Sequence, residues 1–147
     1  MSLKEKLLED MKAAMKDRDT IRKNTIQMVR SAVLQVEKDK RITLSDDGVI
    51  EVIAKEVKKR RDSLPEYEKS GRQDLIDNLK AEIDILSQYL PQPLTEEEIA
   101  TIVRQAIQET GANSAKDIGK VMQAVLPKVK GRADGKKVNE IARKILE

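Results

Sequence analysis

The sequence is most informative between residues 117 and 138, where it reads DIGKVMQAVLPKVKGRADGKKV. Apolar residues recur at helical spacing on both sides of a turn that contains Gly131 and Gly135. From Lys116 to Lys144 the chain has nine Lys or Arg residues and three Asp or Glu residues. Two amphipathic helices joined by a glycine turn, with mostly positive local charge, predict a helical surface suited to a polyanion.

Upstream of this stretch, stripes of apolar residues predict four helices, which begin near residues 3, 20, 46 and 75. The expected N-terminal caps are Ser2 (with Glu5 as its capping-box partner), Thr20, Ser45 and Asp74. In residues 38–44 the apolar residues no longer recur at helical spacing, so this segment is expected to form a loop. Pro65 lies inside the third pattern, and because proline removes a helical hydrogen bond, we expect a kink or break at Leu64.

The segment Pro91-Gln92-Pro93 is the clearest boundary, because two prolines separated by one residue cannot continue a helix. After it, Thr95 and Glu98 form the pattern of a capping box, and three helical stripes follow. Gly111 is expected to end the first, and Ser114 to cap the second. No strand-like alternation is present. We therefore predict an all-α, multihelical fold with two subdomains, about four helices in residues 1–92 and a three-helix bundle in residues 93–147.

Composition limits the chemistry that the chain can perform. It has no cysteine and no histidine, which excludes thiol nucleophiles, thiolate zinc sites and imidazole bases. Its 29 basic and 26 acidic residues give a net charge of +3, so a polyanion site must be local. We expect no catalytic residue, no cofactor and no metal. The charged N-terminus and the lack of a long apolar run predict no membrane segment and a cytoplasmic location.

Two motifs carry a family resemblance. One is IGKVM (118–122) with KGRADG (130–135), followed by Val138, Ile141 and Ile145; the other is GRQDL (71–75) with YLP (89–91) and LTEEEI (94–99). Over nearly the whole chain the sequence resembles the GatB/YqeY family, and within it the stand-alone YqeY proteins. The resemblance implies kinship with the C-terminal region of the B subunit of glutamine-dependent aminoacyl-tRNA amidotransferase, which helps to hold tRNA. The partners that it implies are tRNA and an amidotransferase or aminoacyl-tRNA synthetase.

The basic residues of the C-terminal third are the candidate RNA contacts. They are Lys116, Lys120, Lys128, Lys130, Arg132, Lys136, Lys137, Arg143 and Lys144. The alternative interpretation is that these residues form an ordinary solvated helix face and bind no RNA. We interpret Gly131 as a left-handed helix end and Asp134 as the cap of a helix that begins at Gly135. We attribute Gly119 to close helix–helix approach, with contact to a partner as the second interpretation.

A second basic set lies at residues 55–61, and we expect its side chains to pair with neighbouring acids over the helical bundle. Our functional hypothesis is a tRNA-associated helical protein that does not itself catalyse a reaction. Two alternatives remain. One is a component of a carbon–nitrogen ligase that uses glutamine as amido donor, and the other is a protein–protein adaptor with a helical groove.

Overall fold

The computed structural model describes residues 1–147 and contains only helices, which confirms the all-α, multihelical prediction. The chain divides into two compact units, Met1–Leu90 (unit 1) and Pro91–Glu147 (unit 2). The division lies two residues before the boundary that we placed between residues 92 and 93. None of the helices combines the length and apolar character needed to cross a membrane.

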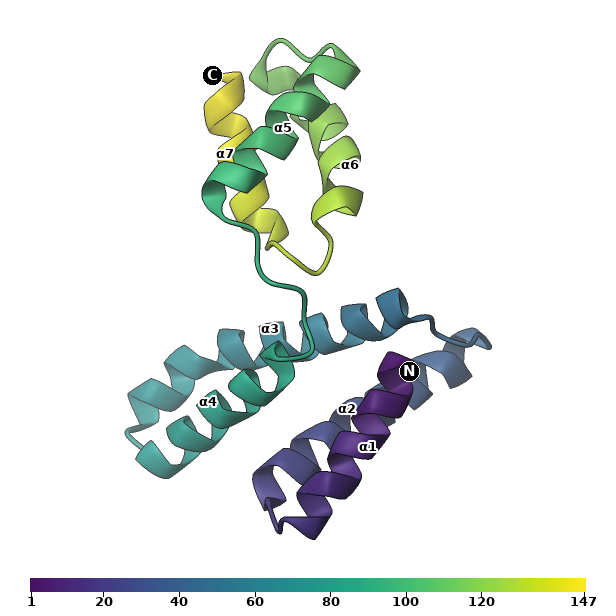
Figure 1. Cartoon of the computed structure of the whole chain (residues 1–147). Coiled ribbons are helices and arrows are strands. Elements are labelled where there is room, and N and C mark those ends of the chain that lie inside the picture. The colour runs from purple at the N-terminus through teal and green to yellow at the C-terminus, as the bar shows by residue number, and fades with distance from the viewer. The chain divides into compact units, whose positions relative to one another are not determined.

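Unit 1 consists of two helical hairpins. They are formed by α1 (Leu3–Lys16) with α2 (Thr20–Lys40) and by α3 (Asp46–Ser70) with α4 (Gln73–Ser87) (Figure 1). Helix α2 packs against both helices of the second hairpin and so joins the two. The core is aliphatic, with Leu7, Ile26, Val29, Ile53 and Leu86 almost fully buried.

Local side-chain chemistry explains where most of these helices begin and end. Ser2 and Glu5 form the predicted capping box of α1, and Ser45 accepts the Gly48 N–H at the start of α3. Gly71 ends α3 with φ of 71°, a left-handed conformation that glycine adopts without strain.

Two predicted caps are displaced. The cap of α2 is Asp19, whose carboxylate accepts the Arg22 N–H at 3.1 Å, and not Thr20. The cap of α4 is Arg72, whose guanidinium has no atom that could accept a helix N–H. Asp74 is the second residue of the helix, and its carboxylate binds the Arg72 guanidinium.

Two predictions about where helices of unit 1 are interrupted differ from the structure. Helix α3 continues through Pro65 to Ser70, so the predicted break at Leu64 is wrong. Pro65 is exposed, as is Arg61, whose carbonyl loses its helical donor, and water can satisfy that carbonyl. The predicted loop at 38–44 is also too long, because α2 runs to Lys40 and ends at Arg41 in a left-handed conformation.

One charged side chain of the second basic set belongs to the interior of unit 1. Arg60 is only 7% exposed. Its guanidinium lies 3.5 Å from a carboxylate oxygen of Glu56 and 3.4 Å from one of Glu82, and it donates to the Glu56 carbonyl. Arg60 therefore joins α3 to α4 through an ionic network in which the guanidinium is buried and both carboxylates are partly buried.

Unit 2 is a three-helix bundle of α5 (Glu96–Thr110), α6 (Ile118–Val129) and α7 (Gly135–Leu146), in which each helix packs against the other two (Figure 1). Thr95 and Glu98 form the predicted capping box of α5, and Gly111 ends it with φ of 70°. Ser114 caps a short 3₁₀ turn, η1 (Ala115–Asp117), rather than α6 itself. The core contains Ile99, Val103, Val121, Val125, Val129, Val138 and Ala142.

Candidate nucleic-acid interface

Helix α7 has two chemically opposite faces. Val138, Ala142 and Leu146 are buried in the core of unit 2. At 100° per residue the opposite side carries Glu140 and four exposed basic residues, which are Lys136, Lys137, Arg143 and Lys144. Helix α7 therefore presents a mainly basic surface to solvent, the kind of surface that binds phosphates.

The nine candidate RNA contacts form two groups in unit 2, not one patch. Five surround the connection between α6 and α7, namely Lys128, Lys130, Arg132, Lys136 and Lys137. The other four lie at the first residues of η1 and α6 and in the last turn of α7, which are at the opposite end of the unit (Figure 1). Since α6 is about 18 Å long at 1.5 Å per residue, one phosphate cannot contact both groups.

Arg132 has a structural role that its sequence position did not indicate. Its Nε donates to the Gln92 carbonyl at 3.2 Å, and its own carbonyl accepts the Leu94 N–H at 2.9 Å. These bonds tie the α6–α7 connection to the segment that leads into α5. Arg132 is thus engaged with the backbone of unit 2, and its replacement would disturb the fold as well as the surface charge.

Two candidate lysines form ion pairs with acids of α5. Lys137 Nζ lies 2.6 Å from a carboxylate oxygen of Glu96, and Lys128 Nζ lies 3.4 Å from one of Glu109. The hydrogen bond and the charge of Lys137 lower the pKa of Glu96, and Glu96 in turn raises the pKa of Lys137. These pairs fit the solvated-face interpretation, because part of each positive charge is balanced within the protein.

Four of the other candidates have fewer interactions with neighbouring acids. The side chains of Lys116, Lys120 and Lys136 are exposed and form no ion pair. On α7, Arg143 Nε donates to the side-chain oxygen of Asn139 at 2.8 Å, which orients the guanidinium but leaves its charge unbalanced. The α7 face is therefore the part of the predicted set with the most available positive charge.

The turn before α7 is built by glycine and aspartate. Gly131 has φ of 77°, a conformation that side chains other than glycine rarely adopt. Helix α6 ends two residues earlier, at Val129, and Lys130 is its C-terminal cap. Asp134 is the N-cap of α7 and accepts the Lys136 N–H at 3.1 Å, and α7 begins at Gly135.

Our first interpretation of Gly119 is wrong. A methyl group added at this position would have no heavy atom within 4 Å, so no neighbouring helix requires a glycine there. Gly119 is the second residue of α6 and lies on its exposed side. The second interpretation, contact with a partner, stays a prediction.

The second basic set, in unit 1, is divided between surface and interior. Lys55, Lys58, Lys59 and Arg61 are exposed on α3, whereas Arg60 is buried. Lys59 Nζ lies 3.7 Å from the Glu56 carboxylate, a pairing of the kind that we expected. The described residues contain no group of three or more acids placed to hold a metal ion.

Comparison with known proteins connects this structure to a family. The model of the family described as "Yqey-like protein" matches residues 4–146. Three fungal relatives carry the name "Altered inheritance of mitochondria protein 41, mitochondrial". The protein from Pyrenophora tritici-repentis is 30% identical over 132 residues, which cover 87% of this chain and 71% of the relative. The one from Kluyveromyces lactis is 37% identical over 102 residues, which cover 67% of this chain and 55% of the relative.

The third relative, from Lachancea thermotolerans, is 33% identical over 87 residues, which cover 58% of this chain and 46% of the relative. The chain thus spans about half the length of the two yeast relatives. Our prediction of a cytoplasmic location is contradicted by these proteins, because all three are named as mitochondrial. The match over residues 4–146, together with the all-helical structure, shows that this chain belongs to the YqeY-like protein family.

Proposed function

We propose that this chain binds tRNA through the basic face of α7 and does not itself catalyse a reaction. The observation that carries the proposal is the segregation of charge on α7, where Lys136, Arg143 and Lys144 are exposed and on one side of the helix. The kinship of the family with the tRNA-holding region of an amidotransferase subunit supports tRNA as the first ligand to test.

The charged residues of unit 2 favour contacts with the phosphate backbone of an RNA over recognition of its bases. Its exposed cations are lysines and arginines, and both tyrosines of the chain, its only aromatic residues, lie in unit 1. Binding that depends on phosphates is strong in low salt and carries little sequence information. Without aromatic side chains on which bases stack, structured RNA is a better ligand than an unstructured strand.

The contacts that each basic residue makes within the protein decide which residues to test. Arg132 and Lys137 are engaged with Gln92 and Glu96, so their loss would change both structure and charge. Lys136, Arg143 and Lys144 can be replaced with less effect on the fold, because their side chains point away from the core. We therefore assign the main phosphate contacts to these three residues.

The experiment is tRNA binding across a salt series with the wild type and the variant Lys136→Gln/Arg143→Gln/Lys144→Gln. Three phosphate contacts predict that affinity falls with about the second to third power of salt concentration. The triple variant should lose most of that dependence. An unstructured RNA of equal length should bind less tightly than tRNA.

The matched control is Lys55→Gln/Lys58→Gln/Arg61→Gln, which removes the same charge from exposed positions of α3. It should leave the salt dependence nearly unchanged. The proposal fails if wild-type protein does not bind tRNA even in low salt, or if both triple variants weaken binding equally. The second result would indicate attraction by net charge without a site.

A further inference from the structure

Helix α2 of unit 1 has an exposed face without charge. Between Asn24 and Gln35 every exposed residue is neutral, and these residues recur at intervals of three or four, which places them on one side of the helix. We call this set the neutral face. Its members are Asn24, Gln27, Met28, Ser31, Leu34 and Gln35.

The neutral face is unusual in this protein. Charged residues make up 37% of the chain, and they dominate the exposed positions of α3, such as Lys55, Lys58 and Asp62. On α2 the pattern is reversed. Arg30 is half-buried and its guanidinium lies 3.7 Å from the sulfur of Met11 on α1, whereas Met28 and Leu34 are 51% and 61% exposed. Two large apolar side chains thus face solvent on a stripe from which charge is absent.

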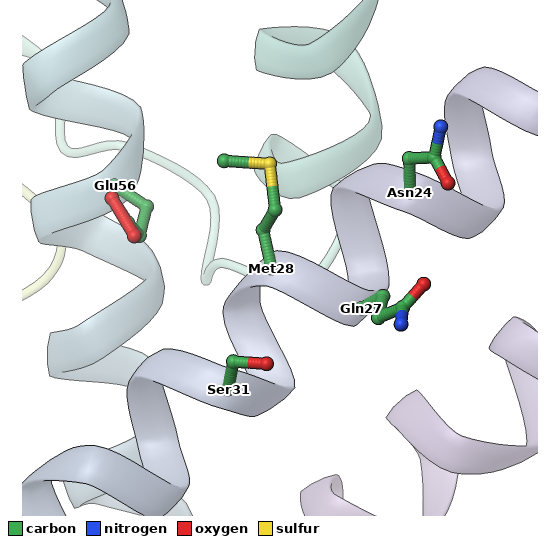
Figure 2. A pocket seen from close by; sticks show the side chains of 5 residues that line it. All are labelled: Asn24, Gln27, Met28, Ser31 and Glu56. Atoms are coloured by element: carbon green, nitrogen blue, oxygen red, sulfur yellow. The ribbon is translucent and has the colours of Figure 1, made fainter.

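A groove accompanies this face. Four of its residues, together with Glu56 of α3, line an open cavity of about 520 Å³. Figure 2 shows Met28 projecting from α2 into the space between α2 and the helix that carries Glu56. Methionine is flexible and polarizable, which suits a contact surface that adapts to a partner. The neutral face and the groove together form a surface on which a helix could pack.

We infer that the neutral face of α2 binds the neutral face of a second copy of this chain. The amides of Asn24, Gln27 and Gln35 each donate and accept, so each can pair with an identical group. Met28 and Leu34 would be removed from water, and no charge on the face would be left buried and unpaired. A surface that complements itself in this way is what a two-fold symmetric dimer requires.

The charges on either side of the face select the orientation. One flank carries Arg30, on the side of α1, and the other carries Glu56, on α3, whose carboxylate also pairs with Lys59 and Arg60 of its own helix. A two-fold axis parallel to α2 places the Arg30 flank of one copy over the Glu56 flank of the other. An axis perpendicular to α2 would bring the two Arg30 flanks together, which like charges disfavour. The two α2 helices should therefore lie parallel.

The size of the face predicts a weak dimer. From Asn24 to Gln35 the helix extends about 17 Å at 1.5 Å per residue, so one helix pair buries less than the roughly 1,200 Å² of a standard interface. We expect dissociation constants in the range of about 10 to 100 μM. Sedimentation equilibrium of the full chain over this range should show a mass that rises from 16.6 kDa toward twice that value.

The test compares two exposed leucines. Leu34→Glu places a charge within the contact and should give a monomer at every concentration, while Leu75→Glu, on α4, should still dimerise. Circular dichroism checks that both variants are folded. A wild-type mass of 16.6 kDa throughout, or equal dissociation of the two variants, would overturn the inference.

Orientation is tested by cross-linking, since the chain has no cysteine of its own. In a parallel pair Asn24 faces Asn24 of the second copy, so Asn24→Cys should form a disulfide-linked dimer on mild oxidation faster than Lys58→Cys, on α3. In an antiparallel pair only the combination of Asn24→Cys and Gln35→Cys would link efficiently, and that outcome would overturn the parallel arrangement.

Discussion

Replacing Tyr89 by phenylalanine should destabilise unit 1, and the loss should depend on pH. Tyr89 follows α4, and its hydroxyl donates to a carboxylate oxygen of Asp10 on α1 at 2.5 Å. Lys6 Nζ binds the other carboxylate oxygen at 3.0 Å. Burial alone would raise the pKa of Asp10, but the hydrogen bonds from Tyr89 and Lys6 and the charge of Lys6 outweigh it and lower this pKa.

The size of the loss follows from this geometry. Tyr89→Phe keeps the ring and removes only the hydroxyl. A hydrogen bond to a charged group contributes about 1.5–3 kcal/mol. Since Asp10 keeps Lys6 as a partner and its side chain is 14% exposed, we expect the lower part of that range, about 1.5–2 kcal/mol at pH 7.

The pH dependence has a definite sign. Because the pKa of Asp10 is lowered in the folded state, its contribution is present above the unfolded value, near 3.8, and is lost as the pH falls through the folded value. The difference in unfolding free energy between wild type and Tyr89→Phe should therefore shrink below about pH 4.

Tyrosine fluorescence during urea unfolding measures this difference. Tyr67 and Tyr89 are the chain's only aromatic residues and both lie in unit 1, so the signal reports that unit. Tyr67→Phe is the control, because Tyr67 is 37% exposed and its hydroxyl has no hydrogen-bond partner. Equal stability of the two variants at pH 7, or a difference that does not change between pH 7 and about pH 3, would refute the reasoning.

Three further substitutions test other parts of the structure. Arg60→Ala removes the buried guanidinium that pairs with the partly buried carboxylates of Glu56 and Glu82 and should lower the unfolding free energy of unit 1 by about 3 kcal/mol, of which Glu82→Gln should restore a part, as measured by urea unfolding. Gly119→Ala should leave the thermal stability of unit 2 unchanged or raise it by up to about 1 kcal/mol, and a clear loss would show that the open space around Gly119 is filled in solution. Glu96→Gln frees the charge of Lys137 and should strengthen tRNA binding about two- to threefold in low salt, whereas weaker binding would count against the proposed face.

Much of the fold could be read from local patterns. The capping boxes at Ser2 and Thr95 and the glycine at 71 act within one turn of chain, and the structure contains all three. Pro65 misled us because the effect of a proline depends on whether the carbonyl that loses its donor is exposed, which is a tertiary property.

The candidate site was less predictable than the fold. Charge composition located a basic region on α6 and α7, but it did not indicate which cations are already paired. The three acids at 96–98 correctly signalled the start of α5, yet nothing in the sequence shows that Glu96 reaches Lys137, some 40 positions later. The contact between Arg132 and Gln92 is of the same kind, because both residues lie outside regular helix and meet only when unit 2 has folded.

Sequence by itself determined that the chain is helical, where most helices begin and end, and which segment separates the two units. These properties depend on interactions between residues a few positions apart. Only the tertiary structure decided which side of a helix is buried. On α2 the apolar residues cover more than one face, and the structure exposes Ile21 and Met28 but fully buries Ile26. The choice between such faces is made by the helices that pack against α2, and their positions depend on contacts between distant parts of the chain.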